Sequence, residues 1–494
     1  MRGLMIFALA TTLFAGSSCS DFLDVVPEDM IPQEEALQSV ADCESYIAGV
    51  YDTYKGSALY SGALTLLPDV QADYVYSVKG YSNTYGEIYK WEITSTTPEV
   101  ETIYRALYRV VAQANFYLEF KGGVKVNNES EQLNFDNMTG EIYLARALAF
   151  SELIRIYCGA YDPDMADKQL GISLSLSYTA RDQKIIRSSL KDSYAQVLRD
   201  IEQAEKLIVD DRSDNPYFSV AAVQMLKARV FLMMNKWDEA VAAATKVIDN
   251  PKYELASGIN FYNMFRFDTG NEIIWKLAMS NTDRGGALGQ SFINYNGSIY
   301  LPDYVPARWI IDLYKEFGDA DVRGKVYITQ QSVSTGYSHG LEWPFMVKYA
   351  GNAVIDAGGR PLFTNMPKVF RLAEAYLIRA EAYYHMGKYN EASKDISTLR
   401  KARISGAGTF SASGDFLYSE IKKERIRELF MEGHRLSDLK RWNEGFKRVP
   451  QAETNDGANK LDIAPGRYEF TWPIPQHELD AVPDIQPNPS NGKN

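Results

Sequence analysis

A block of alternating acids and arginines near the C-terminal end carries the residue types of acid/base chemistry. Its ionisable side chains are Glu424, Arg425, Arg427, Glu428, Glu432, Arg435 and Asp438. A general acid or base needs a carboxyl group whose pKa is shifted by neighbouring charges. However, Glu424 and Arg427 are three residues apart, the spacing of ion pairs on a helix surface that are worth a few tenths of a kcal/mol each. We therefore expect this block to be structural and to lie on a helix surface.

Sequence motifs of catalytic and metal sites are absent. The histidines are far apart and lack the His-Glu-x-x-His spacing; they are His339, His385, His434 and His477. The chain also has no phosphate-binding Gly-x-x-x-x-Gly-Lys, no dinucleotide fingerprint and no Gly-x-Ser-x-Gly elbow. We expect no enzyme activity, no cofactor and no transition metal. A carboxylate pair for glycoside hydrolysis among the 64 acidic residues stays an alternative, and the sequence leaves a bound calcium ion open.

Aromatic residues outside regular elements are the candidates for binding. From Ala72 to Trp91 the sequence ADYVYSVKGYSNTYGEIYKW mixes Tyr with Gly, Ser and Asn and follows neither a helical nor a strand period. The stretch from Asn294 to Tyr300 repeats this composition. Sugars have apolar faces and hydroxyl rims, which suit a flat ring with polar neighbours. The predicted ligand-binding residues are Tyr81, Tyr85, Trp91, Tyr295, Tyr300 and Trp343; the alternative for each is burial between two parts of the fold.

An internal repeat predicts the scaffold that carries these segments. Ala228, Trp237 and Ala240 align with Ala380, Tyr389 and Ala392 at a constant offset of 152 residues. Each copy, 220–250 and 368–403, reads as a helix, a tight turn and an antiparallel helix, which resembles the tetratricopeptide unit. Such units need neighbours to bury a continuous face, so further helices are expected.

Helical periodicity predicts those further helices at 101–120, 141–157 and 193–208, the last with Ser193 as its N-cap. The region 258–359 is rich in Gly, Asn and aromatics, with a strand-like run at 272–277 and one helix near 306–317. We expect a mainly α fold: a helix-pair scaffold over about 35–257 and 360–445, a variable lobe over about 258–359, and an irregular C-terminal segment, 446–494. Loops on a rigid scaffold are where binding residues usually lie.

The N-terminus has the features of an export signal. Arg2 precedes an apolar run, and small residues lead into Cys19. This arrangement resembles a bacterial lipobox, with 1–18 as signal peptide and Cys19 as the lipidated first residue of the mature protein; the alternative is a plain secretory signal. The acidic stretch 20–29 resembles the surface-export signal of Bacteroidetes lipoproteins. Downstream, no apolar run reaches the ~20 residues of a spanning helix, so we expect attachment to the membrane by lipid alone.

Charge and cysteine content narrow the class further. The formal net charge is -12, and an acidic surface repels phosphate backbones, which argues against a nucleic-acid partner. Lipidation of Cys19 would leave only Cys43 and Cys158, too few for a disulfide framework, although the two could pair.

Five segments together resemble the SusD/RagB family of outer-membrane nutrient-binding lipoproteins over nearly the whole mature chain. They are ARALAFSELIRIYCGAY (145–161), LPDYVPARWIIDLY (301–314) with Asp321 and Arg323, FRLAEAYLIRAEAYYHMGKYNEA (370–392), IKKERIRELFMEGHRLSDLKRW (421–442) and WPIPQHELDAVPDIQPNPSNG (472–492). The last departs from the family pattern, since Ser490-Asn491 replaces the usual Gly-Tyr.

The resemblance implies a scaffold of four tetratricopeptide-like units at the outer membrane, facing the cell exterior. It also implies a partner, a SusC-like TonB-dependent β-barrel transporter to which a captured oligosaccharide is delivered without chemistry. A peptide-capturing protein of the RagB type is the alternative, and a purely structural scaffold and a hydrolase are the others. Ligand residues in the family come from variable regions and are not fixed by motif.

Overall fold

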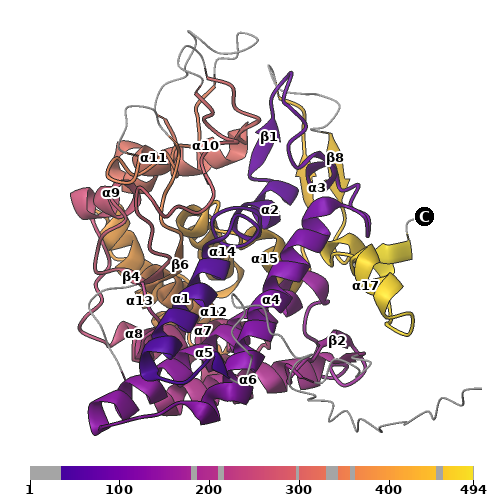
Figure 1. Cartoon of the computed structure of the whole chain (residues 1–494). Helices are drawn as coiled ribbons and strands as arrows, with labels where there is room; N and C mark the ends of the chain where they lie inside the picture. Colours follow the sequence, from indigo (N-terminus) through magenta and orange to yellow (C-terminus); the bar gives the residue numbers. More distant parts are fainter. Residues whose placement is uncertain are drawn as a thin grey trace, which may run out of the picture.

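The computed structural model describes residues 35–179, 186–209, 216–295, 300–329, 343–356, 362–451 and 460–492. The predicted signal peptide, Cys19 and the stretch 20–29 lie outside these residues. Helices dominate the described chain, which confirms the mainly α fold (Figure 1). The first eight are α1 Val40–Lys55, α2 Ala63–Gln71, α3 Gly86–Lys90, α4 Pro98–Phe120, α5 Glu129–Tyr157, α6 Leu190–Leu207, α7 Val220–Met233 and α8 Trp237–Ile248. The others are α9 Gly258–Arg266, α10 Arg308–Lys315, α11 Val322–Tyr327, α12 Leu372–His385, α13 Tyr389–Arg403, α14 Gly414–Leu429, α15 Arg435–Trp442 and α17 Gln476–Ala481.

The strands are short and form two-stranded antiparallel sheets, β1 with β5, β2 with β3, β4 with β6 and β7 with β8. Their bounds are β1 Val75–Ser77, β2 Leu170–Ser173, β3 Arg187–Ser189, β4 Ile273–Lys276, β5 Tyr304–Pro306, β6 Lys368–Arg371, β7 Phe446–Arg448 and β8 Leu461–Ile463.

The internal repeat is confirmed as two helix pairs, α7 with α8 and α12 with α13. The offset of 152 holds for the first residue of each helix, from 220 to 372 and from 237 to 389. It also holds for the turn, where Asn235 (φ 57°) and Gly387 (φ 73°) take the same left-handed conformation. Glycine and asparagine adopt this conformation most readily. The pairs are stacked, since α8 packs on α12 and the Trp237 ring lies 4.2 Å from that of His385, centroid to centroid.

The helices predicted beside the repeat are present, with two corrected boundaries. Helix α5 begins at Glu129 and not near 141, because Asn128 caps it and its first turns are polar and mostly exposed, which hides the apolar period. Each helix from α5 through α6, α7, α8, α12 and α13 to α14 packs on the next. Helix α4 begins with Pro98 in its first turn, where a proline costs no hydrogen bond. The prediction that Ser193 caps α6 is wrong: the cap is Ser189, whose side chain accepts from the Asp192 amide, and Ser193 lies one turn inside.

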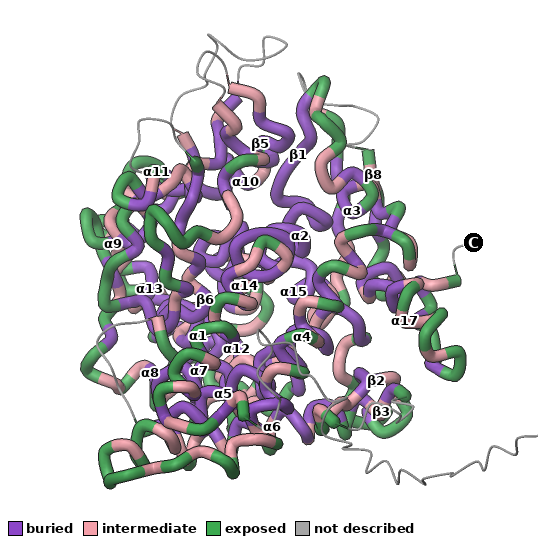
Figure 2. Tube along the Cα trace, in the orientation of Figure 1, coloured by how far each residue is buried: buried purple, intermediate pink, exposed green. Residues whose placement is uncertain are grey.

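The lobe contains the predicted strand and helix, as β4 and α10, but the prediction of a single helix is wrong, since α9 and α11 also lie within 258–359. These helices of nine and six residues are too short to show a clear helical period. Strand β4 pairs with β6 at the start of the second repeat, and β5 pairs with β1 from the N-terminal part of the chain, so segments distant in sequence are joined here. Figure 2 shows β5 beside β1. The core under the lobe includes buried residues from 66–89 and 426–431 as well as from 256–363. The domain boundaries at 258 and 359 stay a prediction, because this core extends across them.

Cys43 and Cys158 are both buried and free, so they do not pair. Burial raises the pKa of each thiol, which keeps both protonated near neutral pH. Within the described ranges no helix is both long and apolar enough to cross a membrane.

Candidate binding site

The pairing of β1 with β5 brings the two predicted aromatic segments together. Val75 lies opposite Pro306 and Ser77 opposite Tyr304. Beyond the strands the Asp303 carboxylate accepts hydrogen bonds from the amide and the hydroxyl of Ser82, both at 2.8 Å. The loop after β1 is therefore fixed to the segment before β5, a connection that the sequence alone did not reveal.

Four of the six predicted ligand residues are half-buried tyrosines at this junction: Tyr81, Tyr85, Tyr295 and Tyr300. The Tyr81 ring lies 6.0 Å from that of Tyr304, and the rings of Tyr295 and Tyr300 are 4.8 Å apart, centroid to centroid. All four pack on the core beneath the lobe while part of each stays accessible. Their contact with a ligand stays a prediction.

Trp91 and Trp343, the other two predicted ligand residues, are buried, which is the alternative given for each of them. Trp91 is 4% exposed and Trp343 is 2% exposed. Each indole N–H has a backbone partner, the Gln71 carbonyl for Trp91 at 2.6 Å and the Pro306 carbonyl for Trp343 at 2.9 Å. Burial of a tryptophan ring removes a large apolar area from water once its N–H is satisfied, so both rings belong to the core.

The backbone at this junction is strained. Of the nine non-glycine residues with positive φ among those described, Asn83, Tyr85, Trp91 and Asn294 lie in the two aromatic segments. Such a conformation costs about 1–3 kcal/mol per residue and is concentrated at ligand clamps and active sites. Asparagine adopts a positive φ more readily than tyrosine does, so the residue type at position 85 gave no indication of this backbone conformation.

Polar groups surround the accessible rings. The Tyr81 hydroxyl and the Lys90 ammonium both donate to Oδ1 of Asn83, at 2.9 and 3.0 Å. The hydroxyls of Ser82 and Thr84 lie 2.7 Å apart and are hydrogen-bonded. Flat rings beside hydroxyl, amide and ammonium groups can stack on the apolar face of a small polar ligand and bind its rim.

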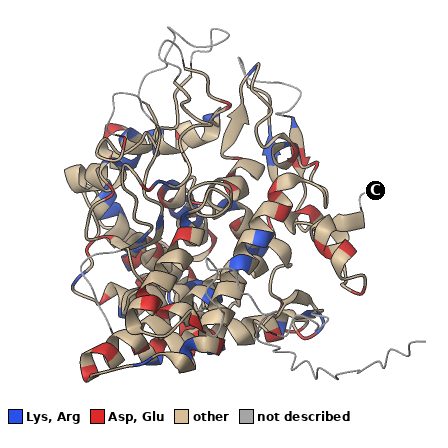
Figure 3. Cartoon of the chain, in the orientation of Figure 1, with Lys and Arg blue, Asp and Glu red and all other residues tan. Residues whose placement is uncertain are grey.

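The charged block at 424–438 is buried, so its predicted location on a helix surface is wrong. The Glu424, Arg427 and Glu428 side chains are 0% exposed, because α11, α13 and β6 supply arginines that cover this face of α14. The pair Glu424–Arg427 forms at 3.3 Å, whereas Arg435 pairs with Asp73, at 2.8 Å. Positions of both charge signs are interspersed along the helices of the molecule (Figure 3).

Glu428 is the centre of this buried network. Its carboxylate accepts from Arg371 at 2.8 Å and from Arg403 at 3.0 Å, and Arg323 lies 3.2 Å away. Burial alone would raise the pKa of Glu428, but these guanidinium groups hold it well below its usual range. Glu424, beside three arginines, has its pKa lowered to about 2 in the same way. Carboxylates held in this way stay ionised, which suits a structural role and not proton transfer.

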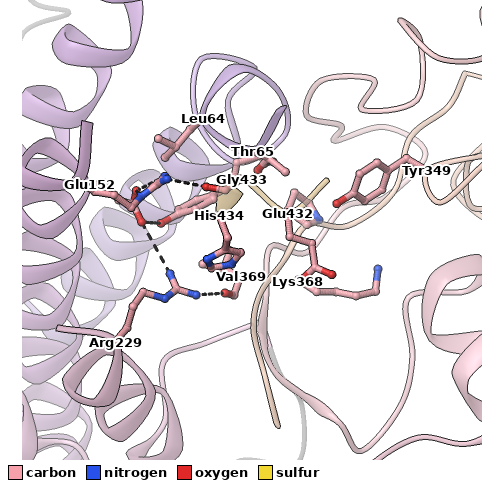
Figure 4. Close-up of a pocket in the computed structure, with 13 residues that line it drawn as sticks. Leu64, Thr65, Glu152, Arg229, Tyr349, Lys368, Val369, Glu432, Gly433 and His434 are labelled. Carbon is pink, nitrogen blue, oxygen red and sulfur yellow. Dashed lines mark hydrogen bonds and ion pairs between the residues drawn. The ribbon is translucent and has the colours of Figure 1, made fainter. Parts of the chain in front are cut away.

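A small buried cavity lies between the scaffold and the lobe (Figure 4). Its walls include Glu152, Arg229 and His434, and Arg229 donates to the Val369 carbonyl at 3.0 Å. The volume of about 30 Å³ holds no more than a couple of water molecules, so this cavity cannot accept a sugar or a peptide.

The buried ionisable groups predict how stability changes with pH. The low pKa of Glu424 gives stability that is present above its ordinary value of 4.5 and lost as pH falls towards 2. Burial and nearby arginines lower the pKa of His434, so its contribution is lost as pH falls below 6.5. Burial raises the pKa of Asp69 to about 7, so Asp69 adds stability as pH falls from about 7 to 4. This gain offsets the stability that His434 loses over the same pH range.

We therefore expect the urea midpoint to change little from pH 7 to pH 5 and to fall steeply below pH 4.5. Asp69→Asn removes the offset, so its midpoint should already decline below pH 6.5. A wild-type midpoint that is unchanged from pH 5 to pH 3 would contradict the role of the buried carboxylates.

Comparison with known proteins gives the fold and the family. The model of the SusD family matches residues 328–490, and a family model described as "Starch-binding associating with outer membrane" matches residues 21–232. The SusD-like protein P38 of Formosa agariphila is 24% identical over 490 residues, covering 89% of this chain and 91% of that protein. The starch-binding protein SusD of Bacteroides thetaiotaomicron is 42% identical over 182 residues, covering 34% of this chain and 30% of that protein.

Among solved structures, a SusD superfamily protein from Bacteroides thetaiotaomicron superposes with a TM-score of 0.80 at 23% identity, covering 91% of this chain and all of that one. The two family models match both the N-terminal and the C-terminal parts of the helical scaffold, on either side of most of the lobe. The chain belongs to the SusD family.

Proposed function

We propose that this protein captures an oligosaccharide at the junction of β1 and β5 and performs no chemistry on it. The observation that carries the proposal is the convergence of two aromatic, amide-rich segments whose backbone is strained at Asn83, Tyr85 and Asn294. The name of the starch-binding relative and the description of the N-terminal family model support a carbohydrate ligand. Tyr81, Tyr85, Tyr295 and Tyr300 are the proposed contacts, and Trp91 and Trp343 support them from the core.

Attachment and delivery belong to the same proposal. Lipidation of Cys19 would hold the protein on the outer membrane facing the cell exterior, and the N-terminal family model is described as associated with that membrane. A SusC-like TonB-dependent transporter would receive the ligand. Co-purification of such a barrel with the full-length lipoprotein from membranes tests the partner, and loss of membrane attachment on Cys19→Ala tests the anchor.

Binding can be tested by electrophoresis of the soluble protein through gels that contain starch or other polysaccharides. We expect one glycan to retard the wild type and Tyr81→Ala/Tyr300→Ala to weaken binding at least roughly tenfold, because two stacking contacts are lost. Tyr389→Ala is the matched control, since Tyr389 is an exposed tyrosine on α13. Retardation that the double variant leaves unchanged would overturn the site. Binding of peptides alone would overturn the ligand class, and product release from any glycan would overturn the absence of chemistry.

A further inference from the structure

A second cavity, separate from the β1–β5 junction, lies between α4, β2 and α17, which share one side of the molecule below α3 (Figure 1). Helix α4 contributes Glu101, Tyr104, Arg105 and Tyr108, whose spacing places them on one helix face. The opposite walls include Ser173 and Glu478. The volume of about 360 Å³ is within the range of small-molecule sites, about 300–1,000 Å³.

Hydrogen bonds hold the walls of this cavity in place. The backbone N–H of Gln476 donates to the Ser95 carbonyl, and the Ser95 hydroxyl donates to Oε1 of Gln476, both at 2.9 Å. These two hydrogen bonds fix α17 against the segment that leads into α4. The Tyr108 hydroxyl donates to the Ser173 carbonyl at 2.8 Å, which fixes β2 to the same helix. A cavity fixed in this way loses little entropy on binding a ligand.

An acidic side chain of the cavity, Glu478, lacks a hydrogen-bond partner among the residues that the structure describes. Glu478 is half-buried, and its carboxylate makes no hydrogen bond or ion pair within the described part of the chain. Burial raises the pKa of this carboxyl, a sign that its charge is poorly compensated. A partly buried carboxylate without a partner has lost hydration that nothing replaces, so a ligand that donates hydrogen bonds to Glu478 would offset this cost.

The charges in the cavity favour a cation. The charge of Glu101 is offset by Arg105, whose guanidinium group lies 3.8 Å from the carboxylate. The Arg105 side chain is 78% exposed, so it points mostly to solvent. Among the described residues only the adjacent His477 offsets the charge of Glu478, so a negative charge remains beside the rings of Tyr104 and Tyr108, whose centroids are 4.6 Å apart. Aromatic faces attract cations, and a carboxylate forms its strongest hydrogen bonds with charged donors.

We propose that this cavity binds a primary ammonium group, carried by an amino sugar or by a lysine side chain of a peptide. Glu478 accepts charge-assisted hydrogen bonds from the ammonium, and Tyr104 and Tyr108 present their rings to the rest of the ligand. The exposed side chain of His477, next to Glu478, borders the opening. This site goes beyond the proposed glycan capture at the β1–β5 junction.

Saturation-transfer NMR titrations of the soluble protein test the proposal with matched probes. Methyl glucosaminide is compared with methyl glucoside and methyl N-acetylglucosaminide, which lack the ammonium. Nα-acetyl-lysine amide is compared with Nα-acetyl-norleucine amide in the same way. Binding of both ammonium probes supports the shared chemistry, and binding of one identifies its source. Neutral probes that bind as tightly as their charged counterparts, or no binding of either ammonium probe, would overturn the proposal.

Two variants of opposite sign assign the binding to this cavity. Glu478→Gln should weaken ammonium binding roughly ten- to a hundredfold, the effect of losing a hydrogen bond to a charged group. Arg105→Gln removes a competing cation and should strengthen it about two- to threefold. Glu92→Gln, an exposed carboxylate outside the cavity, is the control and should change nothing. The double variant Tyr81→Ala/Tyr300→Ala should still bind the ammonium probes when it no longer binds the glycan. Loss of ammonium binding in this variant would overturn the claim that the two sites are separate.

Discussion

Replacing Glu428 with glutamine is expected to lower the free energy of unfolding by about 3–5 kcal/mol. The carboxylate lies between Arg371, Arg403 and Arg323, and all four side chains are at most 1% exposed. A glutamine keeps the size of the side chain but leaves three buried guanidinium groups without this counter-charge, and its amide N–H groups would face other donors. Urea unfolding followed by circular dichroism measures the change.

The control for this variant is an exposed ion pair of similar length. Lys447 and Asp462 lie 3.2 Å apart with side chains 68% and 71% exposed, so Asp462→Asn should leave the urea midpoint nearly unchanged. A loss below about 1 kcal/mol in Glu428→Gln would contradict a framework role for the network. Replacement of the whole network by apolar residues is a different experiment, since a buried ion pair is not itself a source of net stability.

The helical scaffold was predictable because its signals are local. Alanines that allow close helix packing recur at a fixed offset, and the turn at Asn235 and Gly387 uses residues that tolerate a left-handed backbone. Each of these features depends on neighbours within one helix pair. The strand β4 and the helix α10 were likewise visible as short runs with the right period.

The location of the charged block was not predictable from the same kind of signal. Helical spacing identifies the residues that share a face, but it does not say what covers that face. Glu424 and Arg427 do pair across one turn. The arginines around Glu428, however, are Arg323, Arg371 and Arg403, which lie between 25 and 105 positions before it in the sequence. A run of charges that looks solvated in sequence can be buried when distant arginines neutralise it.

The binding segments illustrate the same limit in another form. Composition indicated no regular element around Tyr81, whereas the short strand β1 and the five-residue helix α3 lie on either side of it. The pairing of β1 with β5 then brings the stretches around Tyr81 and Tyr300 to one junction. The contact that fixes them, Asp303 with Ser82, spans 221 positions and has no sequence signature. Composition also could not separate accessible rings from buried ones, because a tryptophan suits either place once its N–H has a partner.

Replacing Trp91 with alanine is therefore expected to destabilise the fold by about 3–5 kcal/mol, the usual cost of deleting a buried aromatic side chain. The ring packs against Phe446 and Phe470 at centroid distances of 5.6 and 5.0 Å, and its N–H satisfies the Gln71 carbonyl. Loss of the ring opens a cavity between the aromatic segment 72–91 and the C-terminal segment, and it leaves Arg448 as the remaining donor to the Gln71 carbonyl. Urea unfolding at pH 7 measures the loss.

Tyr81→Ala separates a core role from a ligand role, because Tyr81 is half-buried and lies in the same aromatic segment as Trp91, on the other side of α3. It should weaken glycan binding while its urea midpoint stays close to that of the wild type. Trp91→Ala should lower the midpoint strongly, and any loss of binding should follow the unfolded fraction. If Trp91→Ala instead kept the wild-type midpoint and abolished glycan binding, Trp91 would be a ligand contact and not a core residue. The pair of variants thus tests whether the rigid base of the junction and its binding surface are formed by different rings.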